Sequence, residues 1–184
     1  PQRNCFVAKI LPGEYYVTRQ QELIGTVLGS CVSVCIRDKF LGFGGVNHFM
    51  LPGTNQESME TSDSAARYGC FAMEQLINMI LKHGGQRSAL EAKISGGGKI
   101  IAGMGDIGLK NIEFACHYLE QEEVPVLSQD LGGDRPRKIL YNPVTGSLKV
   151  KKLNSLHNDT LMIREKDYHN QLQKQPVEGA IELF

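Results

Sequence analysis

The chain has 184 residues, of which 41% are hydrophobic and 22% are charged, values that are ordinary for a globular domain with a single core. Its 20 basic and 20 acidic residues cancel, which argues against nucleic acid or an anionic membrane as a partner. No apolar run approaches the length of a membrane span, and the start at residues 1–4 does not resemble a signal peptide. We therefore expect a cytoplasmic protein without direct membrane insertion.

The five cysteines, at positions 5, 31, 35, 70 and 116, are an odd count without the spacing of a disulfide framework. Reduced thiols in the cytoplasm are the natural interpretation, and Cys35, Cys70 and Cys116 fit a packing role. The sequence contains no Cys-x-x-Cys or His-x-x-x-His pair. We therefore expect neither a metal site nor a cofactor.

Hydrophobic periodicity divides the chain into a strand-rich first half, two helices and a strand-rich end. Helical spacing predicts a helix from Ser62 or Asp63, either of which could cap it, to about His83, and a second helix at residues 109–121. The turn residues 142–146 make the last two strands a hairpin. Strands are predicted at residues 6–11, 14–18, 26–36, 43–51, 92–95, 124–128, 138–141 and 147–153.

The segment 26–36 is the strongest strand candidate. From Cys31 onward its residues alternate between two faces, and the pair Gly29-Ser30 just before the cysteine predicts a bend or bulge within the strand. The segment 43–51 is the next strand along the chain, so we expect the two to pair as neighbours through the turn between them.

Grouped strands with helices between them, without regular βαβ alternation, predict an α+β fold. We expect a layered α/β sandwich with mixed β-sheets and two to three helices, formed by residues 1–153 as one domain. The polar segment 154–184 is predicted to be a C-terminal tail, either a peripheral helix near residues 164–174 or an extended segment. Its apolar end, residues 180–184, could dock on a partner or pack on its own domain.

Cys31 and His48 are the candidates for covalent catalysis. A cysteine attacks only as thiolate, so it needs a nearby base and access to its substrate. Backbone N–H groups of the Gly29-Ser30 bend could form an oxyanion hole, and pairing of the two strands would bring the side chains to one end of the sheet. Both residue types are more often structural than catalytic, so the local chemistry leaves both roles open.

A second motif invites a nucleotide-binding interpretation. Residues 103–108 match the pattern G-x-G-x-x-G and precede a predicted helix. The preceding strand is short and no βαβ unit is predicted around the motif, so we interpret it as a glycine-rich turn into a helix. The run Gly96-Gly97-Gly98-Lys99 likewise lacks the spacing of a phosphate loop.

Two stretches around the cysteine and the histidine carry a family resemblance: TVLGSCVSVCIRD at residues 26–38 and GGVNHFMLP at residues 44–52. Shorter matching elements follow at residues 93–97, 107–111, 130–133 and 145–146. In this order they resemble the CheD family of chemoreceptor glutamine deamidases, over about residues 6–153.

The resemblance implies an activity and a fold. The activity is the hydrolytic deamidation of glutamine side chains to glutamate on methyl-accepting chemotaxis proteins, through a thioester intermediate and without a cofactor. The implied fold is similar to the catalytic domain of the cytotoxic necrotizing factor toxins.

The resemblance also implies a Cys-His-Thr triad. It maps the nucleophile to Cys31, the base to His48 and the third member to Thr26, which would orient the imidazole through its hydroxyl or its carbonyl. Gly25 is the other register for the third member and has no side chain to serve. One departure from the family pattern, at residues 135–137, leaves the role of that loop open.

The implied substrate is a cytoplasmic helix of a chemoreceptor, and a CheC-like phosphatase is a further candidate partner. A non-catalytic adaptor and a receptor methylesterase are the alternative functions. A glutamine on a large helical receptor must be reached without unfolding it, so the active form needs an open groove beside Cys31 and His48.

Overall fold

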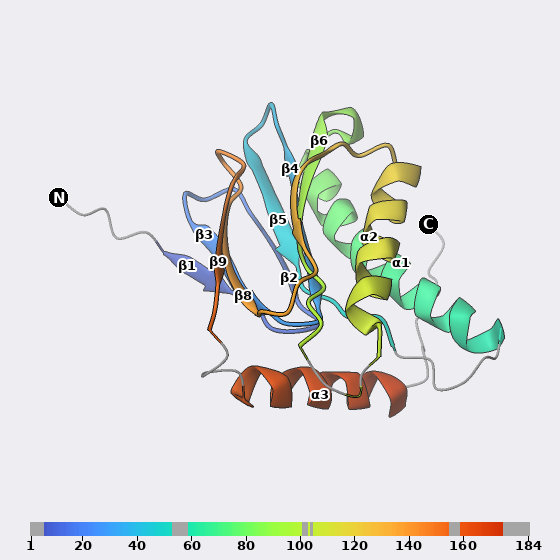
Figure 1. Ribbon diagram of the computed structural model, residues 1–184. Helices are drawn as coiled ribbons and strands as arrows, with labels where there is room; N and C mark the ends of the chain where they lie inside the picture. Colours follow the sequence, from blue (N-terminus) through green and yellow to red (C-terminus); the bar gives the residue numbers. More distant parts are fainter. Residues whose placement is uncertain (1–5, 53–58, 101–102, 104, 155–158, 175–184) are drawn as a thin grey trace.

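The computed structural model describes residues 6–52, 59–100, 103, 105–154 and 159–174, and Figure 1 shows their arrangement. The elements are β1 (Val7–Lys9), β2 (Tyr15–Thr18), β3 (Leu23–Leu28), β4 (Val32–Asp38), β5 (Phe43–Asn47), α1 (Met59–Lys82), a short 3₁₀ helix (Arg87–Ala89), β6 (Leu90–Gly96), α2 (Ile107–Gln121), β7 (Val126–Leu131), β8 (Arg137–Asn142), β9 (Ser147–Lys152) and α3 (Asp159–Lys174).

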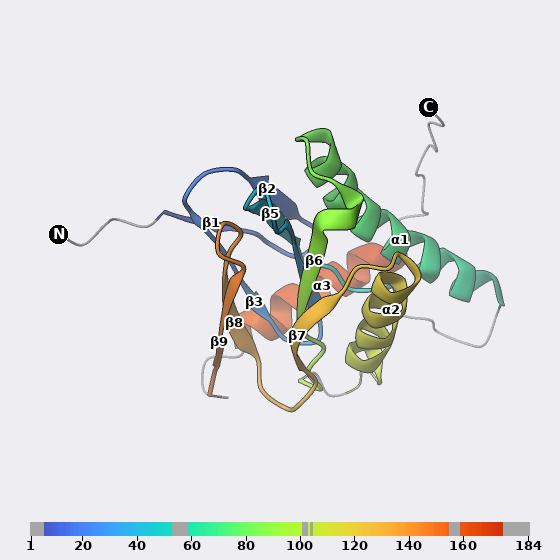
Figure 2. The same ribbon diagram turned by 90° about the horizontal axis from the view of Figure 1, so that it is seen from above.

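The described strands form two mixed sheets, one of four strands in the order β1-β3-β8-β9 and one of five in the order β2-β5-β4-β6-β7. Seen from above, the two sheets lie face to face, and α1 and α2 cover the outer face of the five-stranded sheet (Figure 2). The predicted α+β fold with layered mixed sheets is thus confirmed. The likeness to the cytotoxic necrotizing factor domain stays a prediction.

The predicted single strand at residues 26–36 is wrong. β3 pairs with β8 in the four-stranded sheet, whereas β4 pairs with β5 and β6 in the five-stranded sheet. Residues 29–31 therefore connect the two layers of the sandwich. Periodicity could not separate the two strands because both have apolar faces buried between the same layers, and a bulge and a sheet change carry the same glycine signal.

The first helix begins earlier than predicted, at Met59. Ser62 and Asp63 thus lie within the helix, because the preceding Met59 and Glu60 are good helix formers that extend it by a turn. Its apolar spacing is as expected, and residues such as Met73, Leu76, Ile77 and Ile80 are fully buried in the core.

A βαβ unit is present, contrary to the expectation from the sequence. β6 and β7 are parallel neighbours joined through α2. The expectation failed because the other strand pairs of this sheet are antiparallel, so the regular alternation that marks parallel sheets is missing.

The C-terminal helix α3 spans Asp159–Lys174, which includes the predicted range of residues 164–174. It runs across the ends of the strands (Figure 1) and contacts α1 through a hydrogen bond between the hydroxyls of Tyr168 and Tyr68. The apolar segment 180–184 lies outside the described residues, and the domain boundary at residue 153 stays a prediction. None of the helices in the described part of the chain has the length and hydropathy needed to cross a lipid bilayer.

Candidate active site

Cys31 lies in the connection between the two sheets and is fully buried. Two other segments bind the three carbonyl groups of this connection. Gly98 N–H donates to Gly29 O at 2.8 Å and Gly97 N–H donates to Cys31 O at 2.8 Å. The Asn111 side chain donates from Nδ2 to Ser30 O at 2.9 Å. With all three carbonyls bound in this way, the N–H groups of residues 29–31 point together away from the glycine segment and Asn111.

The approach of residues 96–98 to the cysteine requires glycine. Gly96 has φ = +123°, and a Cβ there would lie 2.2 Å from Cys31 O, far inside the van der Waals contact distance of a carbon and an oxygen. The glycine run at residues 96–98, which lacks the spacing of a phosphate loop, therefore acts as a backbone clamp on the connection.

His48 follows β5 and is buried directly beside this connection. The predicted pairing of its strand with that of the cysteine is confirmed: β4 and β5 are antiparallel neighbours, and a further bridge joins Val32 to Phe49. Each bridging residue directly follows Cys31 or His48, so the register brings the two side chains to the same end of the sheet.

Thr26, on β3 of the other sheet, determines the tautomer of the imidazole. Its Oγ1 lies 2.8 Å from His48 Nδ1 and 2.8 Å from the carbonyl oxygen of Ile10, to which it donates. A hydroxyl has one hydrogen, so Oγ1 must accept from Nδ1–H. The neutral imidazole then carries its lone pair on Nε2, a buried atom without a hydrogen-bond partner among the described residues.

Of the two ways in which Thr26 was expected to contact the imidazole, the structure supports the hydroxyl. The alternative register falls at Gly25, whose space is bounded by side chains of Leu140 and Val7. The side chains of Thr26, Cys31 and His48 thus meet between the two sheets, and their catalytic roles stay a prediction.

Glu165 is a further member of the site that the sequence did not predict. Its carboxylate accepts hydrogen bonds from the N–H groups of Gly29 at 2.7 Å, Ser30 at 2.7 Å and Cys31 at 3.3 Å. The side chain is fully buried although it lies on α3, more than 130 residues along the chain. The sequence did hold a signal for it: Glu165 lies at helical spacing with Leu161, Tyr168 and Leu172, so a charged residue falls on the apolar face of the helix.

The thiol, the imidazole and this carboxylate form one cluster. Cys31 Sγ, a ring nitrogen of His48 and a carboxylate oxygen of Glu165 lie within 4.8 Å of one another. These residue types also bind metals, and sequence spacing could not detect a set drawn from three distant segments. The three N–H donors around the carboxylate, however, stabilise negative charge and oppose a cation, so we interpret the cluster as a thiol–imidazole pair with an anion site.

Burial keeps the pair uncharged in this arrangement. It lowers the pKa of His48 to about 3. Burial also raises the pKa of the Cys31 thiol well above its usual range, and the Glu165 carboxylate raises it further. The expected open groove is absent from the described structure beside the two side chains, whose exposed fractions are 0% and 1%.

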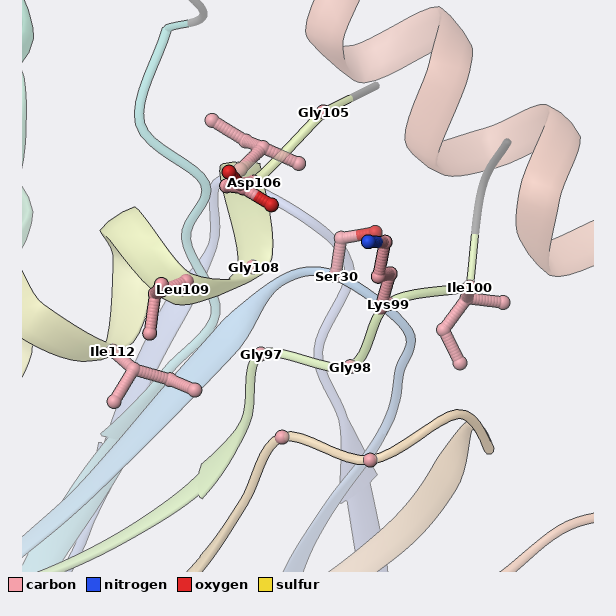
Figure 3. A pocket seen from close by; sticks show the side chains of 13 residues that line it. Ser30, Gly97, Gly98, Lys99, Ile100, Gly105, Asp106, Gly108, Leu109 and Ile112 are labelled. Carbon is pink, nitrogen blue, oxygen red and sulfur yellow. The ribbon is translucent and has the colours of Figure 1, made fainter. Parts of the chain in front are cut away.

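An open pocket lies beside Ser30 of the connection, at the start of α2 (Figure 3). Its lining includes Ser30, Gly97, Lys99 and Asp106 but neither Cys31 nor His48. The G-x-G-x-x-G motif borders it, and within this motif Gly108 packs against the Gly97 backbone, where a Cβ would meet Gly97 O at 2.7 Å. This glycine therefore serves the packing of α2 against the clamp.

Two polar residues hold the surroundings of the site. Asn111, besides binding Ser30 O, accepts the N–H of Leu51 at 2.8 Å and so ties the connection to the segment after His48. Arg137, the first residue of β8 and the last of the three residues that depart from the family pattern, is buried, forms an ion pair with Asp130 and also donates to its backbone oxygen at 2.7 Å. Sequence reasoning assigned neither role, since both depend on contacts between distant segments.

A thiol beside an imidazole that a hydroxyl orients, facing a group of backbone N–H donors, is the arrangement required for covalent catalysis by cysteine. The fold and the site thus define an α+β domain with a candidate cysteine nucleophile. The family model described as CheD chemotactic sensory transduction matches residues 50–152. The chain belongs to the CheD family.

Curated relatives extend the similarity to nearly the whole chain. A protein of Hahella chejuensis named "Probable chemoreceptor glutamine deamidase CheD" is 54% identical over 180 residues, covering 97% of this chain and 85% of that protein. Proteins of the same name from Halorhodospira halophila and Methylobacillus flagellatus are 50% and 51% identical, covering 100% and 98% of this chain and 87% and 91% of theirs.

Proposed function

We propose that this chain is a protein-glutamine glutaminase that converts specific glutamines of bacterial chemoreceptors to glutamate, in the cytoplasm. The carrying observation is the buried thiol–imidazole pair beside three converging backbone N–H groups. The names of the relatives support the substrate class.

Cys31 is the proposed nucleophile and His48 the proposed base. Because Thr26 accepts the Nδ1 hydrogen, Nε2 is free to take the proton of the thiol. The thiolate then attacks the side-chain amide carbon of the glutamine, and the C=O electron pair moves onto oxygen. Thr26 acts by holding the ring in this tautomer and orientation.

The N–H groups of Gly29, Ser30 and Cys31 are the proposed oxyanion hole. They already bind a negatively charged oxygen pair in the structure, which supports their ability to stabilise the tetrahedral intermediate. When this intermediate collapses, the imidazolium donates its proton to the leaving nitrogen and ammonia departs. A water deprotonated by His48 then hydrolyses the thioester and releases glutamate and the thiol.

The test is incubation of a helical chemoreceptor fragment with the purified chain, followed by peptide mass spectrometry. We expect conversion of amide to acid at specific glutamines, abolished in Cys31→Ala and retained in Cys70→Ala, a cysteine on α1 outside the site. Conversion at the wild-type rate by folded Cys31→Ala would refute the proposal.

The same assay separates the alternative functions. A methylesterase would release methanol from methylated receptor instead of ammonia from glutamine. A CheC-like phosphatase is a further proposed partner, and binding to it without any conversion of glutamine would favour the adaptor function.

A further inference from the structure

The anion in the proposed oxyanion hole has the chemistry of the reaction product. Glu165 is a glutamate whose carboxylate contacts the N–H groups of Gly29, Ser30 and Cys31. The fit is close, since a Cβ on Gly29 would lie 2.7 Å from Glu165 Oε2. A glutamate released by deamidation would leave its carboxylate beside the same thiol.

The helix that bears this glutamate also resembles the proposed substrate. Glu165 is presented by a helix, α3, and the receptor glutamines of the proposed function also lie on helices. The buried and half-buried residues of α3 recur at helical spacing, as expected of one amphipathic face that packs on the rest of the domain. They are Leu161, Met162, Glu165, Tyr168, His169 and Leu172.

The attachment of α3 depends on few contacts. Glu165 is its only fully buried residue among those whose side chains are described, and the rest of the inward face is half-buried. A hydroxyl–hydroxyl hydrogen bond joins Tyr168 to Tyr68 of α1. A helix held by one buried carboxylate and a half-buried face can leave at a low cost in free energy, compared with a core element.

We propose that α3 occupies the binding site of the substrate helix, with Glu165 in the position of the product glutamate, and must leave before a receptor helix binds. This inference rests on the proposed function. The surface beneath α3 is then the receptor-binding surface, and the closed structure is an inhibited state in which the product analogue belongs to the chain itself.

The electrostatics of the closed site agree with inhibition. The pKa of Cys31 is raised first by burial and then by Glu165, and Tyr68, Tyr168 and His48 are the other titratable groups at the site. Departure of α3 would remove the carboxylate and admit water, and both changes favour the thiolate.

Glu165→Gln tests the position of the side chain directly. The substitution turns the product analogue into a substrate within the same chain, so we expect its amide to be hydrolysed and the original glutamate to return. Intact mass and a peptide spanning residues 160–170 would record the change from amide to acid. The same substitution combined with Cys31→Ala should retain the amide.

Glu165→Ala tests whether α3 covers the thiol. We expect alkylation of Cys31 by iodoacetamide, read at the peptide level, to accelerate about tenfold or more, the factor typical of losing a charge-assisted hydrogen bond. Deamidation of the receptor fragment should rise in parallel. Asp167→Ala is the matched control, because it removes an exposed carboxylate from the same helix.

The outcomes separate this inference from the proposed function. If no variant deamidates a receptor fragment while Glu165→Ala still exposes Cys31, the proposed function is refuted. The inference that α3 covers Cys31 is then still supported. If the wild-type chain deamidates receptor fragments but the introduced amide persists and Cys31 alkylates equally in Glu165→Ala, the product-like role of α3 is refuted.

Discussion

The two parts that meet at Cys31 are held in different ways. Thr26, Cys31 and His48 are carried by strands and connections whose backbone is hydrogen-bonded in two packed sheets. Glu165 is carried by a helix that covers the ends of these strands and buries only that residue completely among its described side chains. The proposed reactive groups are thus rigidly positioned, whereas their proposed cover is attached at few points.

This difference assigns two tasks to two kinds of structure. The proposed nucleophile, base and oxyanion donors must stay within tenths of an ångström of a productive geometry, which buried strands provide. A cover must open for a large helical substrate, and low-stability elements supply such motion. Substitutions in the sheets should therefore change stability and catalysis, and substitutions in α3 should change access.

Asn111→Ala should have the largest effect on the sheet side. It leaves Ser30 O and the Leu51 N–H without their buried partner, which we expect to lower the free energy of unfolding by about 2–4 kcal/mol. Urea unfolding measures this loss, and Asn78→Ala, an exposed asparagine of α1, is the control. A stable Asn111→Ala with unchanged kcat would contradict the assigned tie.

Thr26→Val should mainly affect catalysis. It removes the acceptor of His48 Nδ1, so the imidazole loses its fixed tautomer, and we expect kcat to fall about 10- to 100-fold. Thr26→Ser retains the hydroxyl and should keep most of the activity. Equal kcat values for the serine and valine variants would remove Thr26 from the triad.

The buried imidazole should make stability depend on pH. The pKa of His48 is about 3 in the folded chain against an ordinary 6.5. Above pH 6.5 the imidazole is therefore neutral in both the folded and the unfolded chain, and its titration does not change the free energy of unfolding. As the pH falls toward 3, only the unfolded chain binds the proton, and the free energy of unfolding decreases by up to about 1.4 kcal/mol per pH unit. Between pH 7 and pH 5 the wild type should lose about 2 kcal/mol more than His48→Gln in urea unfolding; equal losses would contradict a buried neutral imidazole.

Tyr168→Phe should have the smallest effect, and it should fall on the helix side. Loss of the hydroxyl bond to Tyr68 weakens the attachment of α3 by about 1 kcal/mol, which should speed alkylation of Cys31 about fivefold. Global stability should change little. An unchanged alkylation rate together with a lower free energy of unfolding would contradict this prediction, because the bond would then stabilise the whole fold and not the attachment of α3 alone.

Much of the fold was predictable, because short strands, helices and the hairpin at residues 142–146 depend on local periodicity and turn residues. The pairing of β4 with β5 was also predictable from their adjacency. The division of residues 26–36 between two sheets was not, since one apolar alternation is compatible with a bulge or with a change of sheet. The βαβ unit was missed because it is a single parallel pair in an otherwise antiparallel sheet.

By itself the sequence determined the family, the layered α+β class and the candidate residues Cys31, His48 and Thr26, because these depend on motifs and on neighbouring strands. Only the tertiary structure decided that the Thr26 hydroxyl contacts the imidazole, that Asn111 holds the connection, and that Glu165 lies at the same N–H groups. Each of these is a contact between segments distant along the chain, and such contacts are set by packing, not by local pattern.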